Sequence, residues 1–242
     1  MVTIDVNRPR TDERHWRAWL TATALAPVQL PAPGRRILVV AAHPDDEVLG
    51  VGGLLHRLAG QHPIAIVWAT DGEASHPGSS VVRPEALAVI RRQESQRALA
   101  SLDVVPVESH HLGLPDGRLF ECRDNLAAAL RRLVAPGDLV LSTWREDRHP
   151  DHETVGAVTS GLGVECWQFP IWMWQWAEPA DRMVPWRHAR CVPAIDGAAK
   201  ATAIACFTSQ TEALGPEPAD AAILPPHVVE RFVRPFEVVF VE

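Results

Sequence analysis

One stretch, residues 36–60, constrains the fold of this chain most. It opens with a short β-branched apolar run, Ile37 to Ala42, which is typical of a strand buried in a parallel sheet. The charged run His43-Pro44-Asp45-Asp46-Glu47 follows, and then an apolar-periodic segment that ends at Gly60. Acidic residues in a first turn and a closing glycine are typical of a helix. The pattern predicts a strand, a charged turn and a helix, with the charges at the sheet edge where α/β proteins bind ligands.

A second cluster of the same kind lies far downstream. His149-Pro150-Asp151-His152 follows the apolar run Asp138 to Thr143 and precedes a helical segment that ends near Gly161. Proline suits the first position of a helix. Two strand ends therefore present histidine and aspartate to one sheet edge, and two histidines with one carboxylate form a catalytic zinc set that leaves a position for water. Helix capping alone would explain the acidic residues but not the histidines.

Together the two motifs resemble the PIG-L/LmbE-like family of zinc-dependent N-acetylglucosaminyl deacetylases. The resemblance extends from Arg36 to Gln210. It implies that one zinc ion is held by His43, Asp46 and His152. It also implies that Asp45 is the general base and that His149 assists the transition state.

Four further residues are candidates for supporting or substrate-binding roles. Asp151 either orients an imidazole of the site or is a plain first-turn residue. Glu47 caps the helix or orients its neighbours. Asp116, in a Pro-Asp-Gly turn, corresponds to a family residue that contacts sugar hydroxyls. Trp174 belongs to a tryptophan-rich stretch, residues 167–186, that holds five of the nine tryptophans.

The spacing of Trp172, Trp174 and Trp176 predicts one face of a strand or extended loop. This face either fills the core or forms a wall that stacks on a sugar ring or an apolar aglycone. On a helix predicted for Pro84 to Leu102, Arg91 and Glu94 repeat the family's R-x-x-E pattern. We interpret them as a structural ion pair.

Alternating strands and helices predict βαβ units. We expect an α/β fold, a single-domain Rossmann-like three-layer sandwich whose mostly parallel sheet carries helices on both faces. Residues 35–242 would form the deacetylase domain and residues 1–34 an N-terminal helical arm, its helix capped by Thr11. Further segments are predicted as strands at 64–70, 104–110 and 236–241 and as helices at 125–134 and 200–210. Gly50, Gly52 and Gly53 lie inside the first domain helix, which favours close packing over a phosphate loop.

Composition limits the partners and the compartment. The net charge is −7 without a basic run, which argues against nucleic acid and anionic membranes. Four scattered cysteines, a polar N-terminus and no uncharged run long enough to span a bilayer indicate a cytoplasmic protein. The expected partner is a small-molecule amino-sugar conjugate, and the sequence leaves open whether the chain forms a homo-oligomer.

Other functions stay open at this point. The enzyme could be an amidase or deacylase for another N-acyl natural product or a thiol conjugate, because nothing here fixes the aglycone or the acyl group. His43, Asp45 and His152 also match the facial triad of non-haem iron oxygenases, which would require an antiparallel β-sandwich. A third alternative is a sugar-binding protein with a decayed site, although all of the motif residues are intact.

Overall fold

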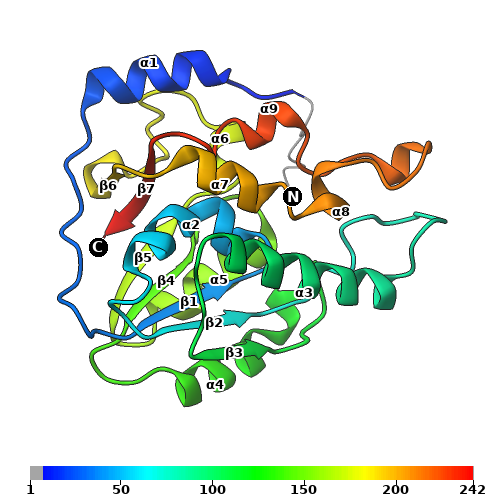
Figure 1. The fold of residues 1–242 in the computed structure, drawn as a ribbon, viewed down its shortest axis with the longest axis horizontal. Helices are drawn as coiled ribbons and strands as arrows, with labels where there is room; N and C mark the ends of the chain where they lie inside the picture. The colour runs from blue at the N-terminus through cyan, green and yellow to red at the C-terminus, as the bar shows by residue number, and fades with distance from the viewer. Residues whose placement is uncertain (1–7, 242) are drawn as a thin grey trace.

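A seven-stranded sheet forms the centre of the computed structural model, which describes residues 8 to 241 (Figure 1). The strand order is β3-β2-β1-β4-β5-β7-β6. The first five strands are parallel, whereas β7 runs antiparallel to both β5 and β6. The strands are β1 Ile37–Ala41, β2 Ile64–Trp68, β3 Glu108–His111, β4 Leu139–Thr143, β5 Glu165–Phe169, β6 Ala189–Pro193 and β7 Phe236–Val241. The predicted mostly parallel sheet is confirmed.

Helices cover both faces of this sheet because the central strands are apolar on both sides. Ile37 and Val39 share one buried cluster with side chains of α1, α2, α3 and α7, whereas Leu38 and Val40 share another with α4 and α5. These helices are α1 Glu13–Thr23, α2 Asp46–Leu58, α3 Pro84–Ser101, α4 Arg123–Leu133, α5 Pro150–Ser160 and α7 Gly197–Ile204. The three-layer prediction is therefore confirmed.

Shorter helical segments complete the chain between these elements. They are η1 Leu119–Cys122, α6 Met173–Trp176, η2 Trp186–His188, α8 Thr208–Thr211, η3 Pro218–Asp220 and α9 Pro226–Val229. No helix among residues 8 to 241 has both the length and the apolar character needed to cross a bilayer.

Several predicted elements differ from those observed. The prediction that Trp172, Trp174 and Trp176 share one face of a strand or extended loop is wrong, because Trp174 and Trp176 lie in the short helix α6 and Trp172 is its N-cap. Only residues 167–169 of the tryptophan-rich stretch belong to a strand, β5. The predicted helix at 200–210 is two helices, because Phe207 has a ψ of 58° and turns its buried side chain into the core. Strand β3 begins only at Glu108, and the preceding Val105 and Val107 face solvent. Strands β5 and β6 were not predicted.

The arm helix also begins differently. Asp12, not Thr11, caps α1, and its carboxylate accepts the backbone N–H of His15. Trp16 and Leu20 of α1 are buried in the same apolar cluster as the sheet. The division into an arm and a domain stays a prediction.

The glycines of α2 allow close packing, as predicted. A Cβ atom at Gly50 would lie 2.1 Å from the ring of Phe169, and one at Gly53 would lie 2.2 Å from Ile195. The helix can therefore approach β5 and the start of α7 only because these positions lack side chains.

The strand order reverses at the pair of strands β1 and β4. From β1 the chain moves outward through β2 and β3, and it then returns to β4 on the other side of β1. Ligands of open α/β sheets bind at such a switch point, outside the carboxyl ends of the strands. His43 follows β1 and His149 follows β4, so both motifs lie at this point.

Candidate active site

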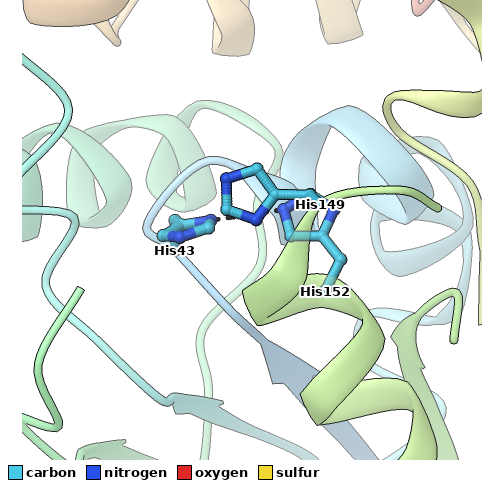
Figure 2. Close-up of side chains that lie close together, drawn as sticks. All are labelled: His43, His149 and His152. Carbon is cyan, nitrogen blue, oxygen red and sulfur yellow. Dashed lines mark hydrogen bonds between the residues drawn. The ribbon is translucent and has the colours of Figure 1, made fainter. Parts of the chain in front are cut away.

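Two loops at the carboxyl edge of the sheet bring the predicted site residues together. His43 follows β1, Asp46 begins α2, and His149 and His152 lie at the start of α5. Figure 2 shows the three imidazole rings gathered around one point. The ring of His43 lies 4.9 Å from that of His149 and 5.2 Å from that of His152.

Three side chains of this cluster place donor atoms at the spacing of metal ligands. His43 Nδ1 lies 3.2 Å from His152 Nε2 and 3.4 Å from Asp46 Oδ2. His152 Nε2 lies 3.3 Å from Asp46 Oδ1. Bonds of about 2.0–2.1 Å to a tetrahedral zinc ion place the ligand atoms roughly 3.3 Å apart. The geometry of this triad fits zinc.

The far nitrogen of each triad histidine faces a carboxylate. His43 Nε2 lies 3.1 Å from Asp116 Oδ1 and 3.3 Å from Asp151 Oδ2. His152 Nδ1 lies 2.7 Å from Asp147 Oδ2. An N–H at each of these nitrogens donates to its carboxylate, so the lone pairs of the opposite nitrogens point into the triad. Carboxylates behind imidazoles orient metal ligands in this way.

Asp147 is a site residue that the sequence analysis missed. It is fully buried, and its carboxylate accepts the backbone N–H groups of Ile171, Trp172 and Met173 at 3.1, 2.9 and 2.8 Å. The only signal in the sequence was a carboxylate just ahead of the second motif. Its role depends on two distant segments, so the spacing of the motif could not reveal it.

The electrostatics of the triad favour a bound positive charge. Burial alone lowers the pKa of His43, but the charge of Asp116 and the hydrogen bonds that the imidazole donates to neighbouring carboxylates raise it well above its usual range. Burial raises the pKa of Asp46, yet the charge of His152 and the contacts with His43 leave it strongly lowered. The carboxylates around the triad are Asp45, Asp46, Glu47, Asp116, Asp147 and Asp151. Such an excess of buried carboxylates favours the binding of a cation.

Asp45 has an unusual backbone that its neighbours hold in place. Its φ of 149° and ψ of −31° are strained for a residue with a side chain. Its N–H donates to Glu47 Oε2 at 3.1 Å, and Ser95 in turn donates to Glu47. Arg91 Nη2 donates to Asp45 Oδ2 at 2.8 Å and to the carbonyl of Pro44 at 3.0 Å. Burial raises the pKa of Asp45 to about 7, although the charge of Arg91 opposes this shift.

The predicted ion pair between Arg91 and Glu94 is wrong. Arg91 turns to Asp45, whereas Glu94 accepts hydrogen bonds from Thr208 Oγ1 at 2.9 Å and from the N–H and hydroxyl of Ser209 at 2.7 and 2.6 Å. Each side chain finds a partner in another element. Arg91 thus belongs to the site, and Glu94 anchors α8 to α3.

His149 differs from the triad histidines. Its Nδ1 accepts the backbone N–H of Asp151 at 3.3 Å, so the neutral ring carries its proton on Nε2. Burial lowers the pKa of His149 well below its usual range, and the charges of His152 and His43 lower it further. The ring is therefore a neutral hydrogen-bond donor at neutral pH.

Comparison with protein families covers both motifs. The family model described as PIG-L: GlcNAc-PI de-N-acetylase matches residues 38–162. This range is more than half of the 242-residue chain. The chain belongs to the PIG-L family. The resemblance inferred from the two motifs is thereby confirmed.

Two curated relatives are similar to about half of this chain. A probable N-acetyl-alpha-D-glucosaminyl L-malate deacetylase 2 of Bacillus subtilis is 32% identical over 130 residues, which cover 50% of this chain and 57% of that protein. A diacetylchitobiose deacetylase of Thermococcus kodakarensis is 28% identical over 141 residues, or 56% and 50% of the two chains. The matches thus span about half the length of these curated relatives.

Solved structures share the PIG-L fold. The N,N'-diacetylchitobiose deacetylase of Pyrococcus horikoshii superposes with a TM-score of 0.55 at 22% identity. The superposition covers 71% of this chain and 69% of that protein. At this identity the likeness supports the fold alone.

A cavity of about 290 Å³ opens onto the triad. The charged and imidazole side chains of its lining lie within the PIG-L match and are those of His43, Asp45, Asp46, Arg91, Asp116, His149 and His152. Beyond the match, the chain adds Ile171, Trp172, Gln210, Ile223 and Leu224. The PIG-L core therefore supplies the charged groups, and later segments supply a largely apolar wall.

The tryptophan in this wall is Trp172, not the predicted Trp174. Trp174 is buried, and its ring packs edge-on against Trp16 with centroids 5.1 Å apart. It is absent from the lining of the cavity. The core-filling interpretation thus fits Trp174, and the wall interpretation fits Trp172.

Proposed function

We propose that this PIG-L protein is a metal-dependent N-deacetylase that hydrolyses the N-acetyl amide of an N-acetylglucosaminyl conjugate. The observation that carries the proposal is the triad of His43, Asp46 and His152, whose lone pairs converge at zinc-ligand spacing beside Asp45. The relatives named as amino-sugar deacetylases support the substrate class. Zinc bound by the triad would supply Lewis acidity to the amide carbonyl and to water.

The chain's own residues divide the proton transfers. Arg91 engages Asp45 Oδ2, so Oδ1 is the oxygen assigned to accept a proton from the attacking water. Water adds to the amide carbon, and His149 Nε2–H donates a hydrogen bond to the carbonyl oxygen as it gains negative charge. Asp45 then returns its proton to the nitrogen as the C–N bond breaks. The products are acetic acid and the free amine, and the acid releases its proton to solvent to give acetate.

The oxygenase alternative finds no support in the fold. It requires His43, Asp45 and His152 on an antiparallel sandwich, whereas these residues lie at the edge of a mostly parallel sheet. Asp46, not Asp45, lies beside both histidine nitrogens. Asp45 is instead paired with Arg91.

The test is a mass-spectrometric screen of N-acylated amino-sugar conjugates with zinc-loaded protein. The expected product is lighter than the N-acetylglucosaminyl conjugate by about 42 mass units, because one hydrogen replaces one acetyl group. Asp45→Asn serves as the control for contaminating activity. Turnover only of N-acyl compounds that lack a sugar would replace the proposed substrate with another amide, and no turnover of any amide would overturn the proposal.

A further inference from the structure

The short helix α6 is held at its carbonyl end by the N-terminal arm. Trp16 Nε1 of α1 donates to the carbonyl of Trp174 at 3.2 Å. Thr11 Oγ1 donates to the carbonyl of Ala177, also at 3.2 Å. The last carbonyls of a helix have no partner within the helix. The arm therefore caps α6, although the two segments are far apart in sequence.

Two buried arginines fix this contact. Arg231 donates to the carbonyls of both Trp174 and Thr11. Arg234 donates to both carboxylate oxygens of Glu13 at 2.8 and 2.6 Å, and its guanidinium lies 4.1 Å from the ring centre of Trp174. The arm, α6 and the segment before β7 are thus joined by polar contacts inside the apolar cluster. Figure 1 shows α1 on the same side of the sheet as α6 and α9.

The other end of α6 is attached to the candidate metal site. The N–H groups of Ile171, Trp172 and Met173 donate to the carboxylate of Asp147. The same carboxylate accepts from His152 Nδ1 at 2.7 Å. A chain of contacts thus leads from the arm through α6 and Asp147 to the imidazole of His152.

We infer that the N-terminal arm is a positioning element for the metal site, acting through α6 and Asp147. This inference rests on the proposed function, because it takes His152 as a zinc ligand. The carboxylate of Asp147 can hold the ring of His152 in its metal-binding orientation only while its own orientation is fixed. That orientation depends on three N–H groups of one segment, and the arm fixes the far end of that segment. The arm lies outside the PIG-L match, so these contacts add to the family core.

Zinc affinity tests this inference directly. The two arm variants are Trp16→Phe, which removes the indole N–H but keeps an aromatic ring, and Thr11→Val, which removes the hydroxyl. The matched control is Trp19→Phe, on the same helix. The ring of Trp19 packs against those of Trp186 and Trp16, with centres 4.6 and 6.1 Å apart, so this change alters the same aromatic cluster but leaves the hydrogen bond from Trp16 to Trp174 in place. The zinc dissociation constant is measured by competition with a chromophoric chelator, and the denaturation midpoint of the zinc-free protein is measured in parallel.

We expect each arm variant to bind zinc roughly tenfold more weakly, in the range known for groups that support metal ligands. The zinc dissociation constant of the control should remain within about twofold of the wild-type value, although its denaturation midpoint changes about as much as the midpoints of the arm variants. If the arm variants bind zinc no more weakly than Trp19→Phe does, the inference is overturned. Because Thr11→Val alters a single hydroxyl, it keeps the test decisive even if Trp16→Phe folds poorly.

A double-mutant cycle then tests the route. In the background of Asp147→Asn, Trp16→Phe should have little further effect on zinc affinity, because its path to His152 is already broken. Fully additive effects would exclude Asp147 as the link. The wild-type protein separates this test from the proposed function: if it binds no zinc, the proposed metal site fails, whereas wild-type binding with unaffected arm variants refutes only the role of the arm.

Discussion

Asp45 combines a strained backbone, a buried carboxylate and an arginine partner in one residue. Asp45→Asn nearly preserves its shape but removes the base. We expect zinc and substrate binding to persist while kcat falls by roughly 10²–10⁴-fold. Single-turnover kinetics with elemental analysis of bound zinc check this result. A variant that retains near-normal kcat would require a different base.

The pH dependence of the rate tests the contact between Arg91 and Asp45. The pKa of Asp45 is about 7, because the increase caused by burial is only partly offset by the charge of Arg91. Because the base must be ionised, kcat/KM should fall as the pH drops through this pKa. Arg91→Gln removes the opposing charge, so the pKa of Asp45 rises and the acid limb moves to higher pH.

The neighbouring Arg92 offers a matched control for this measurement. It lies on the same helix, but its guanidinium pairs with Asp71 rather than with Asp45. Arg92→Gln should therefore leave the acid limb where it is. Equal shifts in both variants would mean that the limb reports a general change of charge and not the contact with Asp45.

At the scale of elements, α2 approaches β5 through Gly50. A Cβ atom there would lie 2.1 Å from the ring of Phe169, whereas one at Gly52 would lie 3.3 Å from the flexible end of Leu102. We expect Gly50→Ala to lower the free energy of unfolding by about 1–3 kcal/mol, as overpacking does. Gly52→Ala should lower the free energy of unfolding by clearly less. Denaturant unfolding of both variants checks the difference, and equal costs would contradict the packing argument.

The apolar wall at the start of α6 should act on substrate binding rather than on the reaction. Trp172 lines the cavity, whereas Trp174 is buried and does not line it. Trp172→Ala should raise KM for a full conjugate while zinc affinity stays within about threefold. With N-acetylglucosamine alone the effect should shrink. An unchanged KM for the full conjugate would assign Trp172 to the core.

At the scale of the whole molecule, metal binding should contribute to stability. A ligand at a thousandfold excess over its dissociation constant stabilises the folded state by about 4 kcal/mol. For a chain of this size, chelation should lower the melting temperature by roughly 10 °C. The stability that the metal contributes should shrink as the pH falls, because protons compete with the metal for His43 and His152, whose pKa values are raised.

Two variants show whether the zinc-dependent change in melting temperature depends on the proposed ligands. His152→Ala should lose the zinc-dependent increment, whereas Asp45→Asn should keep it. Differential scanning fluorimetry with and without chelator provides the measurement. If His152→Ala keeps stoichiometric zinc by elemental analysis, the ligand assignment is wrong.

Much of the fold could be predicted because its signals are local. The strands β1, β2 and β4 are apolar runs that end in polar turns, and α3 has a clear start at Pro84. The predictions failed where tertiary contacts decided the backbone. Phe207 breaks a helical pattern to reach the core, and the tryptophans of α6 alternate in sequence but form one turn of helix.

By itself, the sequence determined the family, the strand-turn-helix units and the five motif residues that meet at the switch point of the sheet, namely His43, Asp45, Asp46, His149 and His152. These depend on short spacings, and a βαβ topology brings consecutive strand ends to one edge. Only the tertiary structure decided that Asp147 faces His152, that Arg91 engages Asp45 and that the arm caps α6. Each of these contacts joins segments whose relative position depends on the packing of the whole core, so no spacing along the chain could reveal them.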